Sequence, residues 1–121
     1  SGHLNFAVID ESATARIEGR YAAAVGTAWT LLGGSYRGRG VIGDVTLFTD
    51  GVSRTVTNDS AGTYTAMENG VGLVHLGARY AVKQQFFNGQ VALAALVSGA
   101  LSAEEHWAVK QLVNAYFDLA L

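Results

Sequence analysis

The chain contains no cysteine and no proline among its 121 residues. Without cysteine it can form no disulfide, no thiolate nucleophile and no cysteine-ligated zinc site. Without proline, no strand is barred by a missing main-chain N–H, and the 15 glycines must supply the tight turns. A cysteine-free chain suits either side of a membrane, so the sequence leaves the cellular compartment open.

Charge and long apolar runs are also scarce. Charged residues make up 15% of the chain and the formal net charge is −2, which gives no electrostatic reason to expect binding to nucleic acid. The longest apolar run, residues 91–97, is far shorter than the ~20 residues of a membrane-spanning helix. Because half of the residues are apolar, we expect a globular domain rather than a disordered segment.

The chain is expected to form one domain over residues 4–121. Its opening Ser1-Gly2-His3 is typical of the remnant of a cleaved expression tag. Strands are expected within residues 4–100 and one helix over residues 102–120.

Hairpin dipeptides divide the chain at regular intervals. Asp50-Gly51, Asn69-Gly70 and Asn88-Gly89 each lie between apolar runs, and such pairs favour type I′ turns. This pattern predicts a mainly β fold, an antiparallel up-and-down meander that closes into a small barrel of about eight strands. The predicted strands cover residues 4–9, 20–32, 35–49, 52–58, 63–68, 71–76, 79–87 and 91–98.

Two local patterns qualify this meander. Gly33-Gly34 is expected to separate two long strands, and the glycines at 38, 40 and 43 indicate bulges or a sharp bend. The alanine-rich stretch 13–32 leaves a helix there as an alternative, which Gly19, Gly26 and the β-branched residues disfavour.

The tail changes to helical periodicity. Ser102 and Glu105 fit a capping box, with Ser102 as the N-cap. Apolar residues then recur at helical spacing; they are Ala108, Val109, Leu112, Val113, Tyr116 and Leu119. We expect an amphipathic helix that packs on the sheet or across one mouth of the barrel.

An ordered series of short motifs extends over about two-thirds of the chain. The motifs are Glu18-Gly19-Arg20-Tyr21, Asp50-Gly51, Ala61-Gly62-Thr63-Tyr64-Thr65 and Glu68-Asn69-Gly70-Val71-Gly72. In this order they resemble small bacterial meander barrels related to the calycin and allene-oxide-cyclase-like proteins. The resemblance implies binding of a hydrophobic small molecule, with a non-covalent cyclisation or isomerisation in some branches. It implies no catalytic residue.

Polar and aromatic residues on the apolar strand faces are the candidates for a ligand site. In the barrel hypothesis they would line the lumen, with Arg54 as cation and Tyr64 or His75 as proton donor to a carbonyl or enolate. The candidate ligand-binding residues are Tyr21, Trp29, Arg54, Tyr64, His75, Gln84 and Phe86.

Each candidate also has a structural interpretation. His75 and Gln84 fit hydrogen-bonded core residues or residues on the outer face, and Arg54 fits a solvent-facing position. Tyr64 fits a core aromatic residue with its hydroxyl at the rim. A one-residue shift of register would reverse every one of these faces.

Other motifs point to no chemistry. His75 and His106 lack the i, i+4 spacing of a zinc motif, so we expect neither a metal nor another cofactor. Residues 38–43 match G-x-G-x-x-G in letters but sit inside the meander, where no helix is expected to follow. Glu104 and Glu105 fall in the first turn of the predicted helix, where its dipole favours negative charge.

Two functions remain open. The first is binding of a small hydrophobic molecule in the barrel lumen, because alanines at 92, 94 and 95 leave room for a ligand. The alternative is a non-enzymatic assembly protein, because residues 91–97 are apolar on both faces and need an outer cover. Trp107, Tyr116 and Phe117 could supply a contact between subunits. We favour a homodimeric binding protein and leave enzymatic activity undecided.

Overall fold

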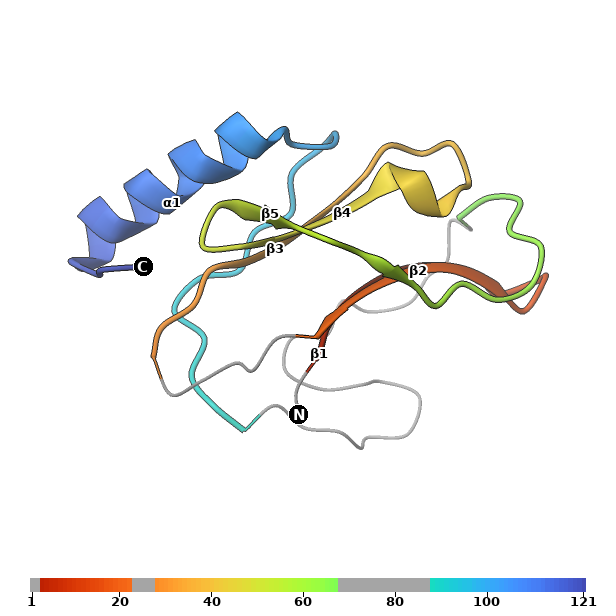
Figure 1. Ribbon diagram of the computed structural model, residues 1–121, viewed down its shortest axis with the longest axis horizontal. Helices are drawn as coiled ribbons and strands as arrows, with labels where there is room; N and C mark the ends of the chain where they lie inside the picture. The colour runs from red at the N-terminus through yellow and green to blue at the C-terminus, as the bar shows by residue number, and fades with distance from the viewer. Residues whose placement is uncertain (1–2, 23–27, 68–87) are drawn as a thin grey trace.

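The computed structural model describes residues 3–22, 28–67 and 88–121, which form two small antiparallel sheets and one helix (Figure 1). One sheet has the strand order β1-β2-β6 and the other has the order β3-β4-β5. Helix α1 lies beside the second sheet (Figure 1). A mainly β, antiparallel fold with a C-terminal helix is therefore confirmed.

The first sheet is built on one long hairpin. β1 (His3–Asp10) pairs with β2 (Ala15–Ala22) along its full length, from His3 opposite Ala22 to Asp10 opposite Ala15. The strand predicted at 4–9 is confirmed. The helix considered for 13–32 is wrong over Ala15–Ala22, because alternate residues of this β-rich segment face the core.

The second sheet combines a predicted turn with an unexpected loop. β4 (Val45–Thr49) and β5 (Val52–Arg54) pair through the Asp50-Gly51 turn, whose φ angles of 52° and 76° confirm the left-handed geometry expected of the dipeptide. β3 (Leu32–Tyr36) pairs with β4. The single strand predicted over 35–49 is wrong, because the chain reverses between Tyr36 and Val45 through the 3-10 turn η1 (Ile42–Asp44).

Gly33 and Gly34 lie inside β3 rather than between strands. Both mark places where another part of the chain comes close to the backbone. A Cβ on Gly34 would overlap the ring of Phe6 from the first sheet, and one on Gly33 would lie 2.7 Å from Cε1 of His106 in α1. This pair therefore serves packing rather than a turn. Of the strand predicted over 20–32, residues 20–22 belong to β2, residues 28–31 form no strand and Leu32 begins β3, while residues 23–27 lie outside the described residues.

Residues 52–58 connect the two sheets. β5 pairs with β4, whereas β6 (Thr57–Asn58) pairs with β2. The predicted strand 52–58 is thus divided between sheets. Buried Val8, Ile17 and Val45 form the core where the sheets meet, and Phe6, Tyr36, Ile42 and Tyr64 pack against it.

Residues 61–66, which follow β6 and which we call the strap, cover this core through Tyr64. Asp10, 3% exposed at the end of β1, accepts main-chain hydrogen bonds from Thr65 (3.0 Å) and Ala66 (3.3 Å). These bonds, together with one from Ala13, lower the pKa of the Asp10 carboxyl group. The strand predicted at 63–68 is absent over residues 63–67, which are the described ones. The main-chain N–H groups of Thr65 and Ala66 donate to the Asp10 carboxylate rather than to a neighbouring strand.

Helix α1 (Ala103–Phe117) begins and ends at identifiable caps. Ser102 and Glu105 form the predicted capping box, which lowers the pKa of Glu105 through the Ser102 hydrogen bonds. The helix ends at Phe117, three residues before the predicted end, because Asp118 adopts the left-handed conformation with φ 52°. Among the described residues, no helix is long and apolar enough to cross a membrane.

The segment that leads into α1 departs from prediction. Residues 91–98 form no strand, and no described strand pairs with them; all of them are exposed. The hairpin expected at Asn88-Gly89 is likewise absent from the described residues. Apolar alternation alone does not make a strand when no partner supplies the ladder. The predicted turn Asn69-Gly70 and the predicted strands 71–76 and 79–87 lie outside the described residues.

Candidate functional site

Two of the predicted ligand-binding residues lie together. Arg54 on β5 places Cζ 5.7 Å from the ring centroid of Tyr21 on β2, which is within the range of a cation–π contact. Arg54 Nε also donates to the Thr49 hydroxyl at 2.5 Å. Arg54 and Tyr21 are both half-buried, so the contact joins the two sheets at their margin.

Tyr64 lies elsewhere, on the strap over the core. Its ring meets that of Tyr36 edge to face, with 6.4 Å between centroids and 85° between planes. Burial raises the pKa of Tyr64, and the neighbouring Tyr36 hydroxyl raises it further. Because Tyr64 packs against the Val8, Ile17 and Val45 core, the structure favours the interpretation of Tyr64 as a core aromatic residue.

The other predicted residues add nothing to a common polar site. Trp29 precedes β3 and is 45% exposed. His75, Gln84 and Phe86 lie outside the described residues. Within the described ranges, the predicted set therefore gives one close pair, Arg54 and Tyr21.

The G-x-G-x-x-G segment, residues 38–43, is held by hydrogen bonds to neighbouring residues. Asp44 is completely buried and accepts hydrogen bonds from the Arg39 main-chain N–H (2.5 Å) and from Arg39 Nε (2.7 Å). The Gly40 N–H donates to the Tyr36 hydroxyl. These amides are therefore engaged, and the 3-10 turn that follows is too short to act as a phosphate-binding helix. The segment closes the β3–β4 loop.

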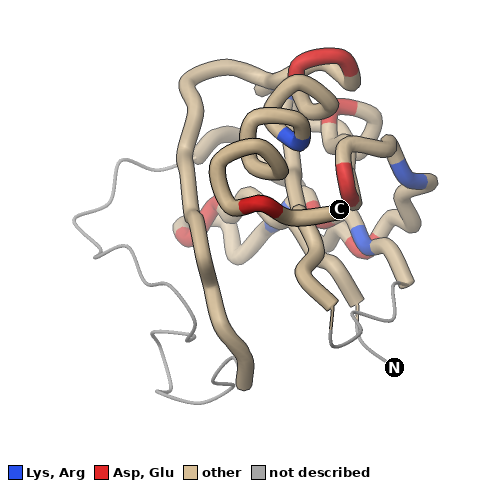
Figure 2. Tube along the Cα trace, turned by 90° about the vertical axis from the view of Figure 1, so that its left-hand side faces the viewer, with Lys and Arg blue, Asp and Glu red and all other residues tan. Residues whose placement is uncertain are grey.

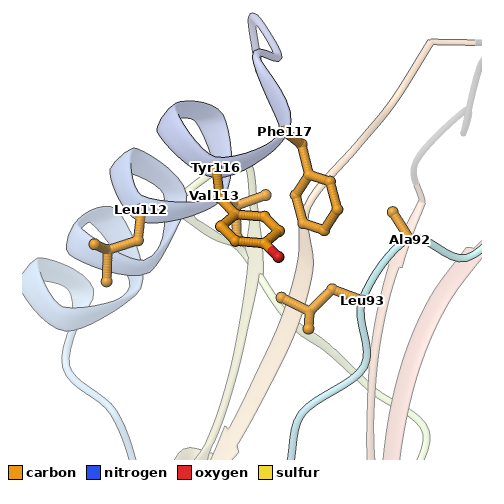
Figure 3. Close-up of a pocket in the computed structure, with 6 residues that line it drawn as sticks. All are labelled: Ala92, Leu93, Leu112, Val113, Tyr116 and Phe117. Carbon is orange, nitrogen blue, oxygen red and sulfur yellow. The ribbon is translucent and has the colours of Figure 1, made fainter.

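An apolar groove lies between α1 and residues 88–102, the segment that leads into it (Figure 3). Its volume is about 630 Å³. Four lining residues come from the C-terminal half of α1 and two from the lead-in segment; they are Leu112, Val113, Tyr116, Phe117, Ala92 and Leu93. None was among the seven predicted ligand-binding residues.

The groove is open and uncharged. Figure 3 shows Phe117 and Tyr116 directed from the helix towards Leu93. The Tyr116 and Phe117 rings meet edge to face with 4.8 Å between centroids, and the Tyr116 hydroxyl is the one polar side-chain group in the lining. Residues 88–103 contain no charged side chain, so the lead-in segment appears entirely tan in Figure 2.

Sequence reasoning also missed a buried pair at the other end of α1. His106 is 8% exposed, and its ring stacks on Phe48 of β4 with 3.6 Å between centroids and 22° between planes. Its Nε2 lies 3.1 Å from the hydroxyl of Ser35, which is also buried. The signal for burial was available, because His106 precedes Val109 by three residues and Val113 by seven and thus shares their helix face.

Ser35 and His106 are as close as a catalytic nucleophile and its base, but both are buried and hydrogen-bonded within the protein. The Ser35 hydroxyl donates to the Leu101 carbonyl oxygen at 3.2 Å, so its proton is already committed to the protein backbone. Neither residue lines the apolar groove. The pair therefore attaches α1 to the sheet and presents no nucleophile to a substrate.

The described residues contain no group of three histidine, aspartate or glutamate side chains placed to hold a metal ion. Comparison of the chain with protein-family models, with curated proteins and with solved structures finds no significant match.

Proposed function

We propose that this chain binds a small hydrophobic molecule in the apolar groove between α1 and residues 92–93. The supporting observation is the groove itself, whose volume of about 630 Å³ falls within the range of small-molecule sites. Its walls are aliphatic and aromatic, and the Tyr116 hydroxyl can orient one polar atom of the ligand. The ligand class is uncharged, because no lining residue can neutralise a charge.

This proposal places the site outside the β-sheets, whereas the resemblance to calycin-like barrels implies a lumen. Closure into an eight-stranded barrel would need two strands beyond the six described. Such closure, with Arg54 and Tyr21 at the lumen, stays a separate proposal. Binding is proposed here without catalysis, because the Tyr116 hydroxyl is the one ionisable group in the lining and no second group lies beside it to complete a catalytic pair.

Titration with the uncharged fluorescent probe Nile red tests the groove. Leu112→Glu places a charge on the groove wall, at a side chain that is already 71% exposed and so contributes little to folding. We expect it to weaken binding of the uncharged probe, because a probe seated against this wall would displace water from the new carboxylate. Gln111→Glu adds the same charge to the preceding residue of α1, which is exposed and does not line the groove, and it is the matched control. Equal affinities for the two variants would exclude the groove as the site.

A second candidate function is self-association through exposed apolar side chains of α1 and of the segment that leads into it. Leu96 is 91% exposed and Tyr116 is 85% exposed, although residues of these types are normally buried. In this proposal a second copy covers them, giving the homodimer expected from the sequence. Sedimentation velocity would then show Leu96→Lys as a monomer, while the exposed-site control Ser98→Lys stays dimeric. If the wild-type chain is a monomer at high concentration, this candidate is excluded.

A further inference from the structure

Helix α1 is attached to the sheet chiefly at its first turns. Of its 15 residues, all of which are described, only His106 is buried. The imidazole ring lies between Phe48 of β4 and Gly33 of β3, where a Cβ would approach Cε1 to 2.7 Å and Nδ1 to 2.9 Å. Beside it, the backbone of Trp107 closes on the β4–β5 turn at Gly51. The rest of the helix is half-buried or exposed.

The hydrogen bonds around His106 indicate which tautomer of the imidazole ring is present when α1 is docked on the sheet. Ser35 has one hydroxyl proton, and it is directed to the Leu101 carbonyl oxygen. This arrangement suits the neutral tautomer that carries its proton on Nε2, because the Ser35 oxygen can then accept from it. A second proton would go to Nδ1, on the side of the ring next to Gly33, where the described residues offer it no hydrogen-bond acceptor.

We propose that His106 makes the docking of α1 pH-dependent: the neutral imidazole holds the helix on the β3-β4-β5 sheet, and the protonated imidazole releases it. Release would also dismantle the apolar groove, since four of its six lining residues are on α1. This second consequence rests on the proposed ligand-binding function. Docking itself does not depend on any ligand.

The charged groups near His106 do not compensate for a charge on the ring. Glu105, the preceding residue of α1, favours the protonated form, but its carboxylate accepts from the Ser102 N–H at 2.7 Å. Asp50 at the β4–β5 turn accepts from the Leu31 N–H, and Lys110 extends over Gly51 and adds positive charge. The residues that touch the ring from β3 and β4 are Gly33, Ser35 and Phe48, none of which is charged.

Burial accordingly lowers the pKa of His106, and Glu105 only partly opposes the effect. A released helix exposes His106 to water, where a histidine titrates near 6.5. The released state therefore binds more protons than the docked state at pH values below about 6.5, and acid favours release. With one proton involved and a docked ring that stays neutral, as the proposal requires, the equilibrium constant for release should rise about tenfold from pH 7.5 to 5.5.

Amide hydrogen exchange of the intact chain measures this release directly. A free helix of 15 residues is marginal in water, so released α1 should exchange its amide protons. We expect the protection factors of α1 to fall about tenfold between pH 7.5 and 5.5, while those of β1 and β2 stay unchanged. His106→Gln keeps a donor for Ser35 without a titratable ring and should change less than twofold. His3→Gln, at an exposed histidine, should behave as the wild type.

Two results would overturn the proposal: constant α1 protection in the wild type, or a tenfold fall that persists in His106→Gln. NMR titration of the wild-type imidazole gives an independent test should His106→Gln fail to fold. A midpoint clearly below 6.5 is expected, and a midpoint at or above 6.5 would contradict the proposal. Ser35→Ala should lower α1 protection already at pH 7.5 and still show the fall in acid, because it leaves the histidine in place.

Discussion

Gly51 lies directly against the backbone of Trp107: a Cβ at Gly51 would stand 3.1 Å from the Trp107 Cα. The contact joins the β4–β5 turn to the second turn of α1. Because Gly51 also has φ 76°, the residue satisfies the turn and the helix contact at the same time. The Asp50-Gly51 dipeptide therefore does more than reverse the chain.

This contact predicts that Gly51→Ala destabilises the protein more than an equivalent change elsewhere. Gly38→Ala is the matched control, since Gly38 has φ 89° but no atom within 4 Å of its Cβ position. The control should lower the free energy of unfolding by about 1–2 kcal/mol from backbone strain alone. Gly51→Ala should cost a further ~1 kcal/mol or more, because the helix must move. Urea unfolding measures both, and equal losses would show that the helix contact contributes nothing.

The packing of His106 makes a similar prediction for Gly33. Gly33→Ala brings a methyl group within 3 Å of two imidazole atoms, so the ring and its helix must shift. We expect a loss of about 1–3 kcal/mol in the free energy of unfolding, the usual range for overpacking. Gly43→Ala, where a Cβ meets no atom within 4 Å, should change stability by less than about 0.5 kcal/mol. A Gly33→Ala variant as stable as Gly43→Ala would contradict this packing.

The hydrogen bonds to Asp10 predict how the free energy of unfolding depends on pH. Hydrogen bonds from Thr65 and Ala13 lower the pKa of its carboxyl group in the folded protein below the usual value near 3.9. Its stabilising contribution is therefore present above about pH 4 and is lost as the pH falls through the lower pKa of the folded state. Asp10→Asn should flatten the loss of stability between about pH 4 and pH 2 in urea unfolding. The exposed-residue control Glu11→Gln should leave the slope unchanged. The same slope in Asp10→Asn as in the wild type would contradict the account of the strap.

Local chemistry made several elements predictable. The Asp50-Gly51 turn and the Ser102–Glu105 capping box each depend on a few adjacent residues, and both are confirmed. The division of residues 52–58 between two sheets was not predictable, because it depends on which distant strands offer free edges. Residues 91–98 have a strand-like composition but no described pairing partner, which no local pattern can reveal.

The candidate site was less accessible to prediction. Arg54 and Tyr21 were both candidate residues and lie together, although no strand pattern indicated their contact. Tyr64 packs with Tyr36 over the core, which matches the structural interpretation that the sequence also allowed. The groove joins the end of a helix to an irregular segment, so no strand periodicity could indicate it. His106 was overlooked because a metal motif was sought where the histidine packs on an aromatic ring.

The most direct test of the central claim is methyl NMR of leucine- and valine-labelled protein during titration with Nile red. The ring current of the bound probe should produce saturable shifts at the groove residues Leu93, Leu112 and Val113. The core residues Val8 and Leu47, which lie away from the groove lining, should not shift. Saturable shifts confined to other methyl groups, or no saturable shifts at any probe concentration, would contradict a hydrophobic ligand site between α1 and residues 92–93.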